Sequence, residues 1–354
     1  MRRSRNAEID EVLLGHVVAA GCGQAPARQA SISAGVPESV GAATINKVCG
    51  SGLFAIMTAD RAIRSGDARI VAAGGMESMS RGPHLLRGAR SGWKYGTGEL
   101  LDSTEYDGLR CSFGATGMGC YADATAAKYG ITREDQDAFA VRSQRLANEA
   151  AQTGAFHNEL VAITVQQGKS TATLAQDESP RPDTTLEDLA KLRPAFGTNG
   201  TATAGNSSPL SDGAAATIVV AETLGRSLDT PWAFRIAAQS VAAGPPAELF
   251  TAPVEAIRKA VKAADKTLNE IDLFEINEAF ASQMLACERL LEIDANKLNV
   301  HGGAIALGHP IGASGARVVV TLLHALVRRE ERWGVAALCL GGGEAVAMVV
   351  ERVR

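Results

Sequence analysis

A cysteine placed where a strand is expected to end and a helix to begin is the first candidate for chemistry. Cys49 lies in the run Asn-Lys-Val-Cys-Gly-Ser-Gly at 46–52, after the β-favouring segment 43–45 and before apolar residues that recur at helical spacing from 53 to 63. Free amides at a helix N-terminus stabilise a thiolate, so we expect a lowered Cys49 pKa. The neighbouring glycines allow a substrate to approach. On this run alone, a nucleophile and a small buried core residue are equally good interpretations.

Three further polar side chains stand at expected strand ends. His309 is held between a glycine and a proline just before a helical pattern, where it could act as the base for a thiol. Cys339 nearly ends an apolar strand and could serve as acid and base, and the glycine turn from Gly341 offers bare amides to an oxyanion. Asn277 ends another apolar strand and could orient a water. Taken singly, these residues also fit a structural histidine, a core cysteine and a helix cap.

The elements that must position these residues follow a repeating order. Short apolar strands alternate with helical patterns in 8–80 and again in 253–350, which predicts a mainly parallel sheet covered on both faces. The runs 72–77 and 340–344 both end a strand in glycines followed by Glu. This similarity indicates an internal duplication with two similar sheets, although chance recurrence of glycine-rich turns would also produce it.

The chain is expected to divide into two halves. The N-terminal half is 1–224, with its core at about 7–80 and 203–224 and an inserted loop domain at about 81–202, where an exposed excursion and a capped amphipathic helix are expected. The C-terminal half is 225–354, and 225–231 is the expected linker.

Composition limits the classes of function. The chain has 354 residues, 46% of them hydrophobic and 21% charged, and a net charge of −4, which is typical of a soluble globular enzyme and argues against a nucleic-acid groove. No apolar run approaches the length of a membrane span, and no apolar signal core follows the basic start. The six cysteines are dispersed without a C-x-x-C pair. This pattern predicts reduced thiols in the cytoplasm and argues against a zinc cluster or a disulfide scaffold.

In combination, the windows around these residues resemble the thiolase family, specifically the acetyl-CoA acetyltransferase and 3-ketoacyl-CoA thiolase group. The resemblance extends over nearly the whole chain from about Glu8. The segments that carry it are 46–52, Ala-Gly-Gly-Met-Glu-Ser-Met-Ser at 73–80, Lys-Leu-Arg-Pro-Ala-Phe at 191–196, Ala-Gly-Asn-Ser-Ser at 204–208, Asn-Glu-Ala-Phe-Ala at 277–281, Gly-Gly-Ala-Ile-Ala-Leu-Gly-His-Pro-Ile-Gly at 302–312 and Cys-Leu-Gly-Gly-Gly-Glu at 339–344.

The resemblance implies a fold and a reaction. The fold would be α/β, with duplicated mixed-sheet lobes layered α-β-α-β-α and an inserted loop domain. The activity would be thiolytic cleavage of 3-ketoacyl-CoA or Claisen condensation of two acyl-CoA molecules, as in fatty acid metabolism and β-oxidation. Coenzyme A and acyl-CoA would be substrates, with no metal and no bound cofactor, in a homodimer or homotetramer with no nucleic-acid partner and no membrane insertion. Acyl chain length and physiological direction stay open.

It also implies roles for single residues. Cys49 would carry the acyl group, and His309 would take its proton and help polarise the second thioester. Cys339 would remove or return the α-proton, and Asn277 would hold a water. The amides of Cys49 and Gly341 would bind the acyl-enzyme oxyanion. The residues expected to contact CoA or the acyl chain are Arg181, Ser208, Met118 and Phe280.

The chain departs from the family pattern at its start. The family has a strand and a helix ahead of the segment matching 8–15, where this chain has only residues 1–6. Loss of that strand is expected to leave two neighbouring strands without backbone partners, at roughly 1–3 kcal/mol for each unpaired amide. The chain is therefore expected to be less than fully stable or active. A smaller departure is Glu344 after the glycines, which removes no catalytic group.

Two other classes of function compete with the enzyme. One is a non-catalytic acyl-CoA- or lipid-binding relative, which has no need of two cysteines and a histidine together. The other is a ketoacyl synthase acting on carrier-protein substrates. Those enzymes resemble this chain in fold but use paired histidines and lack a counterpart of Cys339. Turnover of acetoacetyl-CoA with CoA separates these alternatives.

Overall fold

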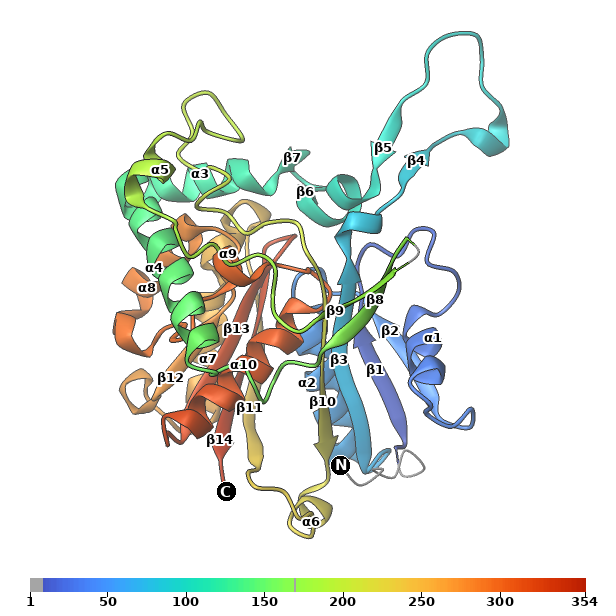
Figure 1. Cartoon of the computed structure of the whole chain (residues 1–354), viewed down its shortest axis with the longest axis vertical. Coiled ribbons are helices and arrows are strands. Elements are labelled where there is room, and N and C mark those ends of the chain that lie inside the picture. The colour runs from blue at the N-terminus through green and yellow to red at the C-terminus, as the bar shows by residue number, and fades with distance from the viewer. Residues whose placement is uncertain (1–8, 169) are drawn as a thin grey trace.

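The computed structural model describes residues 9–168 and 170–354. Layers of helices alternate in space with two four-stranded sheets (Figure 1). Helices α2 (Ser51–Ser65) and α10 (Ser314–Arg328) pack on each other and on both sheets, so they form the middle layer. Helix α1 (Pro26–Ser33) covers the outer face of the first sheet and α7 (Ala252–Ala263) that of the second. The expected α-β-α-β-α layering is confirmed.

The first sheet has the strand order β10-β3-β1-β2 and is mostly parallel. Its strands are β1 (Glu11–Gly15), β2 (Gly41–Ile45), β3 (Ile70–Ser78) and β10 (Asp212–Val220). In this sheet β1 pairs with β2 on one side and with β3 on the other, and Glu11 lies opposite both Gly41 and Val71. The expectation that two strands of this sheet lack backbone partners is therefore wrong, because β1 and β3 hydrogen-bond directly to each other.

The second sheet has the strand order β11-β14-β13-β12. Its strands are β11 (Phe234–Ala243), β12 (Leu273–Ile276), β13 (Trp333–Leu340) and β14 (Glu344–Arg352). Only β12 and β13 are parallel, and the other two pairs are antiparallel. The mainly parallel sheet that the alternation predicted is therefore wrong for this lobe, whereas the mixed sheet that the family resemblance implied is confirmed. The short turn 341–343 joins β13 to β14 as a hairpin, and a parallel pair would need a longer crossover.

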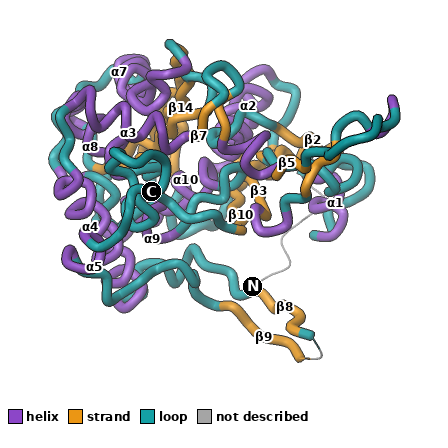
Figure 2. Tube along the Cα trace, turned by 90° about the horizontal axis from the view of Figure 1, so that it is seen from above, coloured by secondary structure: helices purple, strands orange, loops and turns teal. Residues whose placement is uncertain are grey.

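The segment between the two parts of the first lobe lies over the core. It contains β4 (His84–Leu86), β5 (Leu100–Asp102), β6 (Arg110–Cys111), β7 (Thr116–Gly117), α3 (Met118–Tyr129), α4 (Arg133–Gln152), β8 (Ile163–Gln167), β9 (Ser170–Leu174) and α5 (Leu186–Ala190). The β4–β5 arm projects far from the body (Figure 1), and Figure 2 shows the β8–β9 hairpin standing out as well. Helix α4 begins with the expected capping signal, a reciprocal hydrogen-bond pair between Thr132 and Asp135.

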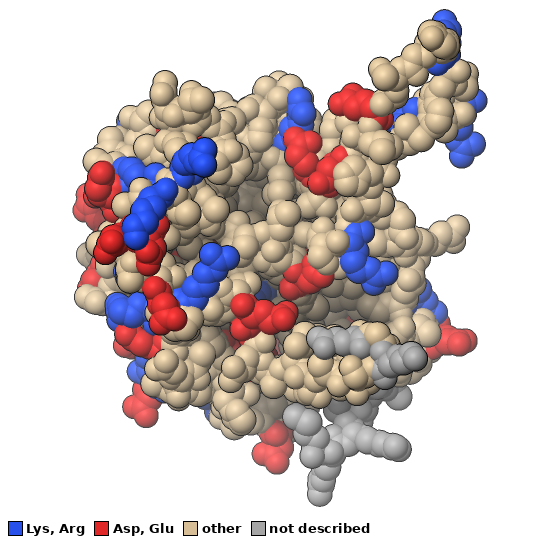
Figure 3. Space-filling view, turned by 45° about the horizontal axis from the view of Figure 1, so that its top comes forward, with Lys and Arg blue, Asp and Glu red and all other residues tan. Residues whose placement is uncertain are grey.

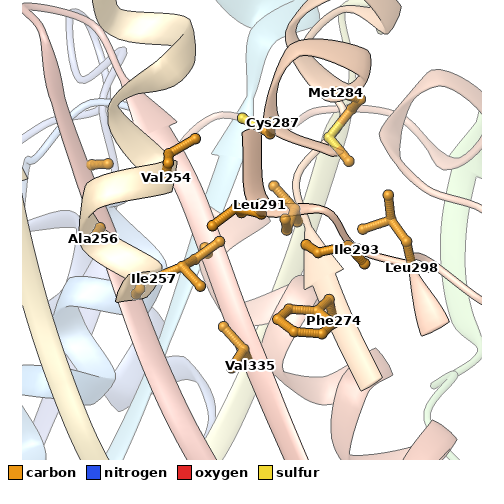
Figure 4. Packing of buried hydrophobic residues seen from close by; sticks show 14 of the residues in the cluster. Val254, Ala256, Ile257, Phe274, Met284, Cys287, Leu291, Ile293, Leu298 and Val335 are labelled. Carbon is orange, nitrogen blue, oxygen red and sulfur yellow. The ribbon is translucent and has the colours of Figure 1, made fainter. Parts of the chain in front are cut away.

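The remaining elements are short, apart from α8. They are η2 (Met79–Arg81), η3 (Ala89–Ser91), η4 (Thr104–Leu109), α6 (Glu222–Gly225), η5 (Pro246–Thr251), η6 (Leu268–Glu270), α8 (Ala281–Leu291), η7 (Ala295–Lys297) and α9 (Ala304–Leu307). The main core of the second lobe lies between the sheet and helices α7 and α8, where Val254, Ile257, Phe274, Met284 and Val335 pack together (Figure 4). On the face shown in Figure 3, charges of both signs are interspersed.

Two expected element boundaries are wrong for identifiable reasons. The helix expected from about Glu278 begins at Ala281, because the backbone of Ala279 and Ala281 hydrogen-bonds to the loop that contains Ser208. The strand expected at 298–300 is absent from the part of the chain that the structure describes. Asn299 has a φ of 46° there, and this left-handed conformation interrupts an extended segment.

Candidate active site

The loop that joins β2 to α2 carries Cys49 and is under backbone strain. Val48 has a φ of 46°, which is unusual for a β-branched residue. The Val48 amide donates to the Asn46 side-chain oxygen at 3.0 Å, and the Ser51 hydroxyl donates to the Val48 carbonyl at 2.6 Å. Gly50 caps α2, so Cys49 stands immediately before the helix, as expected. Strain of this kind persists only where surrounding contacts fix it, and it is frequent at active sites.

The environment of Cys49 keeps its thiol protonated. Burial raises the pKa of Cys49 to about 11, although hydrogen bonds from the backbone of Gly341 and of Cys49 itself lower it. The expected lowered pKa is therefore wrong. Removal of the thiolate from water destabilises it more than the amides at the start of the helix stabilise it. A protonated thiol needs a base before it can attack a thioester.

His309 has the protonation state of a base. Its Nδ1 lies 2.6 Å from the Ser314 hydroxyl, which donates in turn to the Pro310 carbonyl at 2.9 Å. Because Ser314 uses its own proton for Pro310, it accepts from Nδ1, and this assigns the tautomer with a free Nε2 lone pair. Burial and the charge of Arg317 lower the pKa of His309 to about 3. The imidazole is therefore neutral at physiological pH and can accept a proton at Nε2.

Asn277 contacts this imidazole from the end of β12. Its Nδ2 lies 3.4 Å from each ring nitrogen of His309, and its backbone amide donates to the Ala337 carbonyl of β13. The side chain is fully buried, and among the described residues its Oδ1 has no hydrogen-bond partner. Helix α8 is capped at Phe280, so the helix-cap interpretation of Asn277 is wrong. Because the Asn277 side chain does not cap this helix, its buried amide can hold a water or a substrate oxygen.

Cys339 and Gly341 bring the end of β13 to the same place. Cys339 is 2% exposed, and burial followed by the proximity of Cys49 raises its pKa well above the ordinary value. A Cβ added to Gly341 would lie 3.2 Å from Val48, so the turn touches the Cys49 loop. Cys49 also packs against a buried cluster that contains Ile311, two residues after His309. The structure thus places Cys49 beside Cys339 and the Gly341 amide, and Asn277 beside His309, and the Ile311 cluster and the pairing of Asn277 with β13 link the two sets.

Two buried carboxylates that support the site were not predicted as functional. Glu77, at the end of β3, accepts from the amides of Val17 and Gly312 at 3.0 Å and of Val18 at 3.2 Å, and lies 3.2 Å from His16 Nε2. It therefore fixes the loop that follows His309. The sequence signal was present, because Glu77 ends the glycine-rich run at 72–77, but that run indicated a duplication and a family resemblance rather than a role for this carboxylate.

The second buried carboxylate is the residue directly after Asn277. Glu278 accepts from Asn299 Nδ2 at 2.9 Å, the Ser143 hydroxyl at 2.6 Å and the Ile305 amide at 3.2 Å. These donors come from α4, from the loop after η7 and from α9. Glu278 thus ties Asn277 to the glycine-rich segment that leads to His309.

The four expected substrate contacts fall into two groups. Met118 and Phe280 pack in one apolar cluster with Cys339, and Ser208 lies beside it, with its amide and hydroxyl both donating to the Ala279 carbonyl. Arg181 is on the exposed loop between β9 and α5, where its amide donates to the Gln144 side chain at 2.7 Å. Among the described contacts, none joins Arg181 to the four candidate catalytic side chains.

The described residues form neither a metal-binding cluster nor a membrane-spanning helix. Over residues 9–168 and 170–354, no group of three or more His, Cys, Asp and Glu side chains is arranged to hold a metal ion. In the same part of the chain, no helix has the length and apolar character needed to cross a membrane.

Comparison with known proteins gives consistent matches. The family model described as thiolase, N-terminal domain matches residues 4–223, and that described as thiolase, C-terminal domain matches residues 230–352. An acetyl-CoA acetyltransferase of Pseudomonas aeruginosa is 50% identical over 346 residues, and one of Escherichia coli is 48% identical over 346; both alignments cover 98% of this chain and 88% of the relative.

Solved structures agree with these relatives. The acetyl-CoA acetyltransferase of Bacillus anthracis superposes with a TM-score of 0.95 at 40% identity, and human mitochondrial 3-ketoacyl-CoA thiolase with 0.94 at 39%. Each comparison covers 98% of this chain and 88% of the solved one.

Proposed function

The chain belongs to the thiolase family, and on that premise we propose that it is an acyl-CoA acyltransferase that works through an acyl-enzyme on Cys49. It cleaves 3-ketoacyl-CoA with CoA, or condenses two acyl-CoA molecules in the reverse direction. The observation that supports the proposal is that Cys49 lies beside Cys339, and His309 beside Asn277, with each residue at the end of a separate element. The comparisons give no support to the non-catalytic alternative.

In the first half of cleavage, the neutral His309 takes the Cys49 proton and the thiolate attacks the 3-keto carbon. The amides of Cys49 and Gly341 hold the developing oxyanion. The bond between the α- and β-carbons then breaks. The Cys339 thiol gives its proton to the departing α-carbon, while His309 and a water on Asn277 hold the enolate oxygen. Acetyl-CoA leaves, and the remaining acyl group stays as a thioester on Cys49.

In the second half, CoA regenerates the enzyme. The CoA thiol gives its proton to the Cys339 thiolate, and the resulting CoA thiolate attacks the Cys49 thioester. Cys49 leaves as a thiolate and recovers its proton from His309. The raised pKa values of both cysteines fit the protonated thiols with which cleavage begins. Condensation is the same sequence reversed.

The remaining parts of the proposal concern context. The substrates are CoA and acyl-CoA, with Met118 and Phe280 beside the acyl group and Ser208 and Arg181 toward CoA. Thiols without disulfide bonds at all six cysteines support a cytoplasmic location. A role in fatty acid metabolism follows from the acyl-CoA substrates. The halves are 1–224 and 225–354.

We also propose a homodimer or homotetramer. Exposed Trp93, Tyr95 and Leu100 on the β4–β5 arm support subunit contacts there. Light scattering after size-exclusion chromatography tests the oligomer, and a monomer at micromolar concentration would contradict it.

The activity is tested by mixing acetoacetyl-CoA with CoA and following the loss of enolate absorbance. The purified, folded chain is expected to turn over, whereas Cys49→Ala is not. Absence of turnover from folded protein would contradict the proposal.

A further inference from the structure

An ion pair joins the two loops that supply the nucleophile and the oxyanion amide. Lys47 Nζ lies 2.5 Å from Glu344 Oε2, across 297 positions of the sequence. Lys47 is two residues before Cys49, and Glu344 is three residues after Gly341. The Lys47 side chain is 19% exposed and that of Glu344 37%, so both are partly shielded from water.

A second contact restricts the Lys47 side chain. Its ammonium also lies 5.3 Å from the centre of the Phe54 ring on α2, in cation–π geometry. Glu344 occupies the position that corresponds to Glu77 in the duplicated pattern. The Glu77 carboxylate is buried and accepts hydrogen bonds from backbone amides, whereas the Glu344 carboxylate pairs with Lys47 of the Cys49 loop.

The loop that Lys47 belongs to needs an external restraint. Val48 is held at a positive φ, a conformation that costs about 1–3 kcal/mol where it is imposed on such a residue. Local hydrogen bonds from Asn46 and Ser51 fix its shape but do not attach it to β13. The Gly341 turn touches the loop at Val48 through apolar atoms and reaches Cys49 through one backbone hydrogen bond to its sulfur.

We propose that Lys47 and Glu344 are positioning residues for acyl transfer. Their ion pair sets how closely Cys49 approaches the Gly341 amide, and so how well the acyl-enzyme oxyanion meets its donor. This inference rests on the proposed function, since the geometry it sets is that of the Cys49 thioester. Partly exposed ion pairs contribute little to folding stability, about 0–1 kcal/mol. A displacement of about 1 Å at a reacting group, by contrast, costs up to about 100-fold in rate.

Charge reversal tests the pair directly. Lys47→Glu, Glu344→Lys and the double swap are compared with the wild type in the cleavage of acetoacetyl-CoA. Each single reversal is expected to lower kcat about 10-fold with KM for CoA changed less than about 2-fold, and the swap to restore kcat to within about 3-fold. A rescued kcat at constant KM separates positioning from loss of fold. Thermal unfolding confirms that each variant is folded.

A second ion pair provides the matched control. Lys128 and Glu248 are joined at 2.8 Å between α3 and η5, and neither residue belongs to the Cys49 loop or to the Gly341 turn. Lys128→Glu and Glu248→Lys are expected to leave kcat unchanged. Folded single variants at Lys47 or Glu344 with wild-type kcat, or a swap no faster than the singles, would overturn the inference. A wild type without turnover would instead contradict the proposed function, and the inference with it.

Discussion

Asn277 Nδ2 lies 3.4 Å from both ring nitrogens of His309, so a buried amide from β12 meets the imidazole of the glycine-rich loop. The two residues come from separate elements of the second lobe, and each is fixed independently. Ser314 holds the ring of His309, and the Ala337 carbonyl holds the backbone of Asn277. In the proposed mechanism, this contact forms the part of the site that receives the second thioester.

Removing the Asn277 amide is expected to slow the reaction without preventing acylation. Asn277→Ala should lower kcat about 100-fold, because one donor to a developing oxyanion is lost. Steady-state cleavage of acetoacetyl-CoA measures this, and Asn296→Ala, at an exposed asparagine, is the control. If Asn277→Ala stays within about 2-fold of the wild-type kcat, Asn277 has no such role.

Ser314 is expected to act through the tautomer of His309. Ser314→Ala removes the acceptor of Nδ1, so part of the population should carry its proton on Nε2 and fail as a base. We expect kcat/KM to fall about 10-fold. Ser65→Ala, at an exposed hydroxyl at the end of α2, should have no effect. Unchanged kcat/KM in folded Ser314→Ala would show that the tautomer is set by something else.

Replacing Cys339 should separate the two half-reactions. Cys339→Ala is expected to keep acetyl transfer from acetyl-CoA to Cys49, because a CoA thiolate leaves without an acid. Exchange of the acetyl α-protons with deuterated water should fall at least about 100-fold. Nuclear magnetic resonance follows the exchange, and Cys22→Ala, at an exposed thiol, is the control. Exchange at the wild-type rate would remove Cys339 from the mechanism.

Stability is expected to fall as the pH rises through neutrality. Burial raises the pKa of Glu159 to about 7, although Arg317 and Thr321 lower it. The Glu159 carboxyl therefore keeps its proton in the folded chain up to about pH 7, whereas in the unfolded chain it loses that proton near its ordinary pKa of about 4.5. The stabilisation from this proton is complete below about pH 4.5 and is lost as the pH rises through about 7.

The variant Glu159→Gln should remove part of that pH dependence. Its free energy of unfolding is expected to exceed that of the wild type by about 1–3 kcal/mol at about pH 8 and to match it at about pH 4. Denaturant titrations at both pH values measure the difference, and Glu38→Gln, at an exposed carboxylate, is the control. Equal curves for Glu159→Gln and wild type at pH 8 would mean that this carboxyl ionises normally.

Local signals in the sequence were enough to predict which strand and loop ends carry the candidate residues. The strand at 273–276 has the expected bounds, and Gly66 ends α2 in a left-handed conformation with a φ of 87°, as a C-terminal glycine should. Cys49, His309, Cys339 and Asn277 stand at loop or strand ends, as the alternation of apolar runs and glycines predicted. Such signals are encoded within a few neighbouring residues.

Contacts between distant segments could not be predicted in the same way. The pKa of Cys49 depends on how much protein covers it, and the covering residues come from the loop after β1, from η2 and from the loop after His309. Glu77 collects amides from two segments that lie about 60 and 235 positions away. The direct pairing of β1 with β3 likewise depends on how two strands that are distant in the sequence align side by side, which neither strand's own sequence specifies.

The central claim is that Cys49 carries the acyl group. Protein mixed with acetyl-CoA and quenched in acid should yield one peptide bearing an added acetyl group, located on Cys49 by tandem mass spectrometry. Later addition of CoA should remove that group, and Cys49→Ala should yield no acetylated peptide. Acetylation of folded wild type at another residue, or at none, would contradict the account.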